Sequence, residues 1–197
     1  MLRKLCFSFA LSISLTSFAN AQDGRYRLVF NSREYKAVGR SYPQLWMMTL
    51  PEKQKVKYAP GTCTPQPIES GTLPSGVQLP ERGEHWNYLT GVSASPNGKL
   101  LLVGSEAGSS DSHFEDYWLF DPASKSFKYV GGGNGAQWSP HSSKILWSTP
   151  RSLGPIGKIH VWVSHLVVVD VHTLERQSLT SGISYEDSFF WCSSVPN

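Results

Sequence analysis

The sequence lacks an excess of charge of either sign. Lysine and arginine total 18 against 15 aspartates and glutamates, and the formal net charge is +3. Arg3 and Lys4 belong to the amino-terminal leader described below, which leaves 16 basic and 15 acidic residues in the rest of the chain. A protein that binds nucleic acid or an anionic membrane through its charge needs a basic cluster or a clear basic excess. The sequence has neither, so we expect no nucleic-acid partner.

The leader also lacks the continuous apolar run of about 20 residues that a transmembrane helix requires. Its apolar stretch, Leu5–Phe18, is shorter and broken by serines, and Ala19-Asn20-Ala21 matches an A-x-A cleavage site. With the two basic residues that come first, these are the parts of a secretory signal peptide. We therefore predict a signal peptide at residues 1–21, a single mature domain at residues 22–197, no membrane span after cleavage, and a periplasmic or secreted protein.

Cysteine is scarce, with three in the whole chain. Cys6 lies in the leader, so Cys63 and Cys192 remain. An even number of cysteines in an oxidising compartment permits one disulfide, and two unrelated cysteines are the alternative. A bridge needs the two Cα atoms within about 7 Å, which requires the Pro-rich stretch around Cys63 to fold back. Cys63 and Cys192 are a candidate disulfide whose pairing the sequence leaves open.

What the chain does contain is an internal repeat between Val92 and Leu179. The same order of features occurs twice: a serine-proline turn, an apolar run, and a second apolar run that ends in an aspartate. The turns begin at Ser95 and Ser139, and the aspartates are Asp121 and Asp170. Repeats of this length, built from short apolar runs and tight turns, are typical of four-stranded propeller blades. The predicted fold class is all-β, a propeller-like array of four-stranded antiparallel blades.

The predicted blade-like units cover residues 25–58, 89–130 and 136–180. The first lacks an inner strand, whereas residues 188–191 resemble an inner strand with nothing after it. We predict that residues 188–191 pair with residues 25–30, so that both ends of the chain build one blade and protect each other's edges. Three blades are few, since propellers typically have about four to eight. A stunted fourth blade within residues 59–88, an open arc, and a short relative of a longer protein remain as alternatives.

Two stretches interrupt the strands. Residues 59–82 contain five prolines and three glycines, which predicts a long irregular excursion with at most a short edge strand at Val77–Leu79. Gly131–Gly135 is rich in glycine, but no helix follows that would complete a phosphate-binding loop. We interpret it as a flexible connector between blades.

Two segments resemble the W-S-P-D-G-K-x-I phrase of TolB-type, WD-repeat-like propellers: Trp138-Ser139-Pro140-His141-Ser142-Ser143-Lys144-Ile145 and Ser95-Pro96-Asn97-Gly98-Lys99-Leu100. Ser178-Leu179-Thr180 is similar to the closing L-T of that repeat. The resemblance covers residues 89–191, and residues 25–58 more weakly. It implies a propeller fold. Because the family includes a periplasmic scaffold protein as well as gating domains of serine peptidases, the resemblance does not decide the function.

The chain departs from the family phrase in two ways. Ala94 stands where the phrase has tryptophan, and Asn97 and His141 stand where it has aspartate. These positions shape turns and the packing of blades, so the expected fold does not depend on them.

The lengths of the connections point to one face of the predicted propeller. In blade order, the short turns lie together at one end of the strands. Four long segments lie together at the other end: 31–43, 59–88, 105–116 and 149–165. Long loops on a rigid scaffold are the usual place of recognition. The candidate binding residues on this face are Trp86, His113, Glu115, Asp116 and Trp162.

The same face offers little for metal or catalytic chemistry. Asp111, His113, Glu115 and Asp116 could ligate a cation, but a solvated polar loop is the favoured interpretation. His160 and His165 are five residues apart in a predicted strand, which would place them on opposite faces. We predict no metal site and no cofactor. No G-x-S-x-G or H-E-x-x-H motif occurs, so no catalytic residue is predicted and a protein without enzymatic activity is favoured.

Two hypotheses of function follow. The first is an exported, non-catalytic binding or scaffold protein that contacts a protein partner through the long-loop face. The alternative is a carbohydrate-binding, small-ligand-binding or hydrolytic propeller with a pocket at the centre of that face. The sequence says nothing about the oligomeric state.

Overall fold

The computed structural model describes residues 25–36, 39–40, 42–80, 87–107, 114–156 and 159–193. The predicted leader, residues 1–21, lies outside this part of the chain. The described residues form strands, turns and irregular segments with no helix, which confirms the all-β class. Within them, therefore, no helix is long and apolar enough to cross a membrane. The strands are β1 (Tyr26–Lys36), β2 (Gly39–Arg40), β3 (Gln44–Leu50), β4 (Gln54–Lys57), β5 (Asn87–Ala94), β6 (Leu101–Ala107), β7 (Glu115–Asp121), β8 (Ser126–Trp138), β9 (Lys144–Ile156), β10 (Ile159–Asp170), β11 (Arg176–Ser178) and β12 (Ser184–Trp191).

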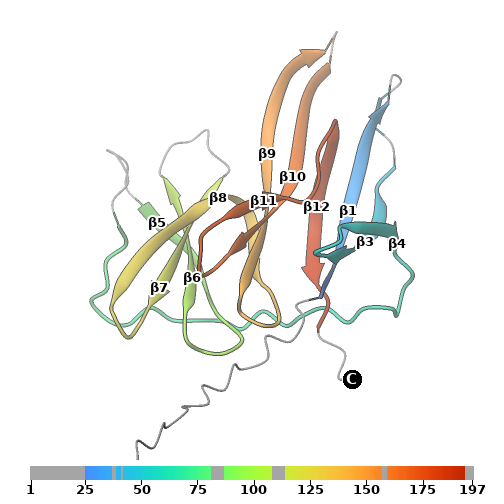
Figure 1. Cartoon of the computed structure of the whole chain (residues 1–197). Helices are drawn as coiled ribbons and strands as arrows, with labels where there is room; N and C mark the ends of the chain where they lie inside the picture. Colours follow the sequence, from blue (N-terminus) through green and yellow to red (C-terminus); the bar gives the residue numbers. More distant parts are fainter. Residues whose placement is uncertain are drawn as a thin grey trace, which may run out of the picture.

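Hydrogen bonds join the strands in the order β4-β3-β1-β12-β10-β9-β8-β7-β6-β5, with β11 on β10 and β2 on β1. Along this path lie three antiparallel units of four strands (Figure 1). The first unit is β5, β6, β7 and the start of β8, the second is the end of β8 with β9, β10 and β11, and the third is β12, β1, β3 and β4. The path ends at β4 and β5, which do not pair, so the sheet is not a closed barrel.

The units are linked in two ways. Strand β8 passes from the first to the second, pairing with β7 up to Gly133 and with β9 from Asn134 onward. A single parallel pair, Ser164 opposite Tyr185, connects the second unit to the third and makes the whole sheet mixed.

The two ends of the chain build the third unit together. Strand β12 runs antiparallel to β1, with Leu28 opposite Trp191 and Val29 opposite Phe190. This is the pairing that the sequence predicts. It gives β1 neighbours on both sides, since β3 pairs along its other edge, and so buries the main-chain groups of the amino-terminal strand.

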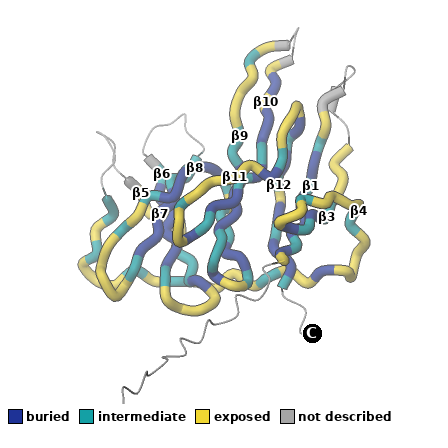
Figure 2. The backbone as a smooth tube through the Cα atoms, in the orientation of Figure 1, coloured by how far each residue is buried: buried dark blue, intermediate teal, exposed yellow. Residues whose placement is uncertain are grey.

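Apolar side chains pack between the faces of neighbouring units. Phe30 and Trp191 of the third unit lie in one buried cluster with Leu166 of the second. Trp147 and Val169 of the second unit share another cluster with residues of the first. Figure 2 shows the buried segments along the strands, inside the stack, and the exposed ones mainly in the turns, along edge strand β4 and along the upper part of β9. The units therefore stack face to face.

The glycine-rich stretch 131–135 does connect the first two units, but as part of strand β8, so the expectation of a flexible segment is wrong. A Cβ on Gly133 would lie 2.2 Å from the carbonyl oxygen of Ser148 and 2.4 Å from Cδ1 of Trp147. Gly131 has a φ of 148°, and a Cβ there would lie 2.6 Å from Cζ2 of Trp147. The glycines are required because the large, buried Trp147 packs directly on the backbone of β8.

Tryptophans at equivalent repeat positions join neighbouring inner strands. The indole of Trp138 donates to the carbonyl of Ser93 at 3.3 Å, and that of Trp191 donates to the carbonyl of Gln137 at 3.3 Å. The first unit has Ala94 at this position, and within the described residues no unit precedes it whose carbonyl an indole could reach. The alanine thus stands in the unit at the end of the array.

A segment of the Pro-rich excursion, residues 64–71, occupies that end and is called the strap. The Gln66 amide donates to the carbonyl of Trp191 at 2.7 Å. Further along, the Ala94 amide donates to the carbonyl of Glu69 at 2.8 Å, and the Gly71 amide to that of Val92 at 3.0 Å. The strap therefore connects the inner strand of the third unit with that of the first, along the lower side of Figure 1.

Two expectations for this excursion are wrong. The strap lies at the end of β12 and β5, beside the short turns, and not on the face of the long connections. Residues 77–79 form no strand. Val77 and Leu79 instead pack on Val103 and Phe120, on the outer face of the first unit, because burial of these side chains does not need a regular ladder.

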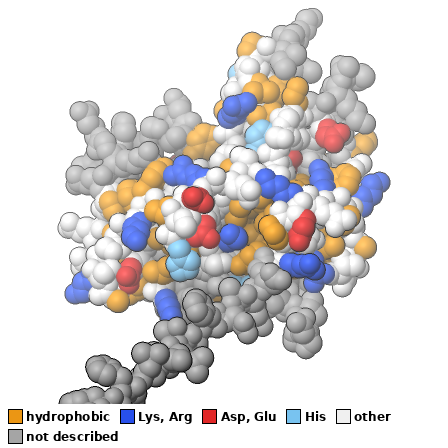
Figure 3. Space-filling view, in the orientation of Figure 1, with side chains coloured by type: hydrophobic (Ala, Val, Ile, Leu, Met, Phe, Trp, Pro, Cys, Tyr) orange, Lys and Arg blue, Asp and Glu red, His pale blue; other side chains and the backbone are white. Residues whose placement is uncertain are grey.

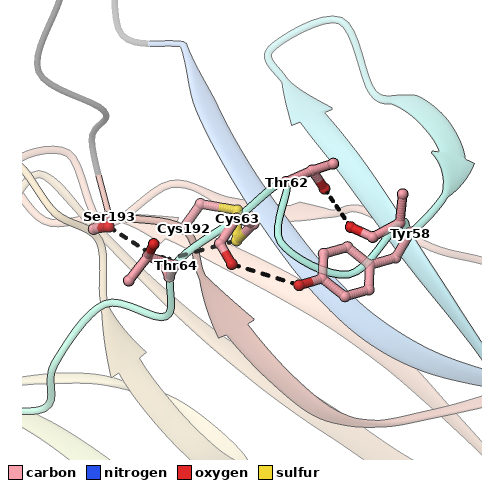
Figure 4. The surroundings of a disulfide bond; sticks show 7 residues. Tyr58, Thr62, Cys63, Thr64, Cys192 and Ser193 are labelled. Carbon is pink, nitrogen blue, oxygen red and sulfur yellow. Dashed lines mark hydrogen bonds between the residues drawn. A yellow bond between two sulfur atoms is a disulfide. The ribbon is translucent and has the colours of Figure 1, made fainter.

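Cys63 and Cys192 form a disulfide, with their Cα atoms 5.3 Å apart (Figure 4). The bonded sulfurs pack with Val29 on the outer face of the third unit. Next to the bridge, the Tyr58 hydroxyl donates to the carbonyl of Cys63 at 3.5 Å, and the Ser193 amide donates to that of Thr64 at 2.7 Å. The disulfide thus fixes the beginning of the strap to the last strand.

The two repeat aspartates hold the turns after β7 and β10. Asp121 accepts hydrogen bonds from the Ser124 hydroxyl and the Ala123 amide, which lower its pKa. At Asp170, desolvation raises the pKa, but the Thr173 and His172 amides and nearby Lys144 outweigh it, so the net shift is downward. Both carboxylates favour the ionised form, as expected of side chains that accept main-chain hydrogen bonds in turns.

A change of Asp170 to asparagine should therefore have a pH-dependent cost. Because the folded pKa is lowered, the stabilisation by the carboxylate is present above its unfolded pKa and is lost as the pH falls through the folded pKa. We expect Asp170→Asn to lower the free energy of unfolding by about 0.5–1 kcal/mol at neutral pH and by less at about pH 3. Urea unfolding at several pH values measures this. Glu175→Gln, in the same turn, is the control, and an Asp170→Asn cost that does not change with pH would contradict the assignment.

Candidate functional site

The β9–β10 hairpin extends well beyond the rest of the sheet (Figure 1). Strand β8 pairs with β9 no further than Ser148, and β12 pairs with β10 only at Ser164. Beyond these points, residues 149–156 and 159–163 form a two-stranded projection that we call the ribbon. It lies at the end of the sheet where β1 and β6 end and β7 begins, so the expected long connections 31–43 and 105–116 are in large part strand.

Prolines are accommodated in the ribbon by its register. Pro155 lies opposite His160 and Pro150 opposite Ser164. A proline has no N–H, so these positions fit an antiparallel pair at the points where no amide is donated to the partner strand. A bulge between Val161 and Trp162 leaves Leu153 without an opposite residue, and Gly154 beside it has a φ of 83°. The bulge turns the outer part of the ribbon.

One face of the ribbon carries aromatic and polar side chains. The rings of His160 and Trp162 are 5.7 Å apart, and His160 Nε2 lies 2.6 Å from the Ser152 hydroxyl oxygen. That oxygen also accepts the Gly154 amide at 3.0 Å. Trp162 is 41% exposed and Leu153 38% exposed. Figure 3 shows hydrophobic side chains on this projection, whereas acidic and basic side chains are interspersed over the body below it.

The two histidines do not share a site. His165 is mostly buried, and its Nδ1 lies 3.6 Å from Oε2 of Glu186. His160 instead contacts Ser152 on the exposed face of the ribbon. In the described part of the chain, no three histidine, cysteine, aspartate or glutamate side chains come together in a way that could hold a metal ion.

Glu115 and Asp116 lie at the start of β7 and point to different partners. The carboxylate of Glu115 accepts a hydrogen bond from the Tyr117 hydroxyl, and that of Asp116 accepts one from the Tyr129 hydroxyl at 2.8 Å. Burial, together with the hydrogen bond to Glu115, raises the pKa of Tyr117, which stays protonated as the donor. The structure thus uses both carboxylates to hold tyrosines and does not bring them together. Trp86, Asp111 and His113 lie outside the described residues.

A buried polar cluster, which the sequence did not reveal, centres on Glu186 of β12. Glu186 is 2% exposed. Its Oε1 accepts hydrogen bonds from the hydroxyls of Ser184 at 2.7 Å and Ser32 at 3.3 Å, and its Oε2 accepts one from Thr180 at 3.1 Å. Thr180 in turn accepts the Leu166 amide at 3.0 Å. The cluster therefore joins the second unit, the linker that follows β11, and the third unit.

No pattern in the sequence could have identified this cluster. Glu186 alternates with Ser184 and Ser188, which predicts a polar, solvated face for the strand. Ser188 is exposed, but Ser184 and Glu186 are buried because the linker around Thr180 and strands β1 and β10 cover them. The cluster borders a cavity of about 450 Å³ between this linker and the outer strands of the third unit.

Comparison with known proteins gave no match to a family model and no match to a curated protein sequence.

Proposed function

We propose that this chain is an exported, non-catalytic binding protein with a small TolB-like propeller fold, and that it contacts a protein partner through the long-connection face. The observation that carries the proposal is the ribbon. It places Trp162 and Leu153, both substantially exposed, on a projection away from the main body of the sheet. Large aromatic and apolar side chains in such positions gain their stabilisation when a partner covers them.

Three observations support the fold and localisation in this proposal. The three antiparallel units have the strand order of propeller blades, with the repeat serines in the first turn of two of them. The third unit takes strands from both termini, as propellers commonly do. The leader at residues 1–21 and the Cys63–Cys192 disulfide fit an oxidising compartment outside the cytoplasm. A single domain at residues 22–197 and a periplasmic or secreted location belong to the same proposal.

The ribbon suits a contact that depends on shape and aromatic surface more than on charge. Arg151 is its one charged side chain among the described residues, and Pro150 and Pro155 stiffen β9. A stiff platform loses little conformational entropy when it binds. His160 and Trp162 are held side by side before any partner arrives.

A capture experiment tests the proposal. Residues 22–197 are immobilised, incubated with an envelope extract, and the retained proteins are identified and quantified by mass spectrometry. We expect one partner to be retained by the parent chain and reduced by about tenfold or more with Trp162→Ala, the loss typical of an aromatic side chain at the centre of an interface. Ile68→Ala is the matched control, because Ile68 is 64% exposed but lies on the strap at the other end of the strands.

The two variants separate the outcomes. A partner that is lost with Trp162→Ala and kept with Ile68→Ala supports the ribbon as the binding element. Equal retention by all three proteins, or no retained partner at all, contradicts the proposed function.

A further inference from the structure

A cavity beside Glu186 lies apart from the ribbon. Its volume of about 450 Å³ lies within the range of small-molecule sites. Its buried floor is formed by Ser32, Ser184 and Glu186, and its rim by Lys53, Lys55 and Ser181. These residues come from β1, the β3–β4 hairpin, the linker after β11, and β12, so the cavity exists only where these elements pack together.

The buried carboxylate determines which atoms the floor offers to a ligand. The hydroxyls of Ser32 and Ser184 both donate their hydrogen to Oε1 of Glu186. A hydroxyl that donates in one direction keeps its oxygen lone pairs for another. Oε1 itself already accepts two hydrogen bonds, so the floor presents serine oxygens as acceptors. It therefore favours a ligand that brings several hydrogen-bond donors.

The rim offers donors in return. Lys53 Nζ donates to the carbonyl of Ser178 at 2.8 Å, and an ammonium group has two further N–H donors. Lys55 Nζ lies 4.4 Å from the centre of the Trp46 ring, and this contact holds the Lys55 side chain against β3. The lysines are balanced by two carboxylates, Glu34 and Glu186, among the residues that line the cavity. A balanced set of charges does not select a strongly charged ligand.

We propose that this cavity binds a neutral polyhydroxylated ligand of about monosaccharide size. A sugar hydroxyl donates and accepts at once, which matches acceptors on the floor and donors at the rim. Among the apolar lining residues, Met48 and Leu179 are buried and Ile183 is 55% exposed, so the C–H face of a sugar ring can rest on Ile183. The inference depends on the Glu186 cluster and not on the ribbon or its partner.

Titration with neutral monosaccharides tests this inference. The probes are glucose, galactose, mannose and N-acetylglucosamine at millimolar concentrations, and the readout is the ¹H–¹⁵N spectrum of residues 22–197. We expect at least one of them to give saturable shifts at the amides of Ser32, Lys55 and Ser184. Acetate and the cation spermidine are run in parallel and should give no saturable shifts at these amides.

One substitution fills the cavity without touching its buried floor. Ser181 is exposed at the rim, so Ser181→Phe should fold and should weaken sugar binding by about tenfold or more. Ser75→Phe, in an exposed turn of the excursion after the strap, is the control and should bind as the parent does. Saturable shifts that Ser181→Phe abolishes support the site. No shift with any sugar, shifts that Ser181→Phe leaves unchanged, or a response to acetate or spermidine alone would overturn it, and none of these outcomes depends on the capture experiment.

Discussion

Glu186→Gln should lower the free energy of unfolding by about 2–3 kcal/mol, measured by urea denaturation at neutral pH. The carboxylate is buried and accepts hydrogen bonds from three hydroxyls, two on Oε1 and one on Oε2. Glutamine keeps the shape of the side chain but replaces one oxygen by an NH₂ group. That group would face hydroxyl donors, and at least one buried polar group would lose its partner.

The neighbouring Asp187 provides the control for this prediction. Asp187 accepts a hydrogen bond from Asn31 at 2.9 Å and pairs with Arg33 at 3.5 Å, but both side chains of the ion pair are partly exposed. Exposed ion pairs contribute little, so Asp187→Asn should cost about 1 kcal/mol or less. Equal effects of the two substitutions would show that burial of Glu186 contributes no more than a surface carboxylate does.

The sequence predicts the strands of this fold well because most of them follow local rules. The serine-proline turns and the apolar runs locate β5, β6, β7 and β10, and the unmatched strand at residues 188–191 predicts the pairing of β12 with β1. These features depend on neighbours in sequence or on a simple count of strands. The number of units could not be settled in the same way, because the strap replaces a missing neighbour with irregular backbone.

The errors occur where packing overrides local preference. Gly131–Gly133 indicates a loop, but the strand continues because Trp147 needs the space of the missing side chains. Residues 149–165 are predicted as a long connection, but they belong to β9 and β10, and Pro150 and Pro155 fit β9 at positions that donate no amide to β10. Each case depends on a residue in another strand, which the sequence alone does not place.

The candidate sites show the same limit more strongly. A tryptophan in a predicted long connection indicates a contact residue, and Trp162 does lie on the exposed ribbon. Glu115 and Asp116 fall in a predicted long connection as well, but they bind tyrosine hydroxyls on different sides of β7. The Glu186 cluster joins elements more than 150 residues apart in the chain, and no spacing rule covers such a distance.

Removal of the disulfide by Cys63→Ala with Cys192→Ala should lower the free energy of unfolding by about 4 kcal/mol. The two cysteines are 129 residues apart, so the bridge closes a long loop and restricts the unfolded state strongly. Alanine at both positions leaves a small cavity against Val29 but no buried polar group. Urea denaturation of the oxidised parent and of the double variant measures the difference.

The same variant should also change the folded state locally, because the disulfide holds one end of the strap. Hydrogen exchange should become faster at the amides of Gln66 and Ser193, which bond across the two segments next to the bridge. The amides of Gly71 and Ala94 lie at the other end of the strap, where their hydrogen bonds to the first unit do not involve the cysteines, and should stay protected. Exchange that increases equally at both ends would mean that the strap opens as one piece, and unchanged exchange at Gln66 would mean that its hydrogen bonds alone hold it. Faster exchange confined to the cysteine end would show that the disulfide and the strap's hydrogen bonds to β5 hold the two ends of the strap independently.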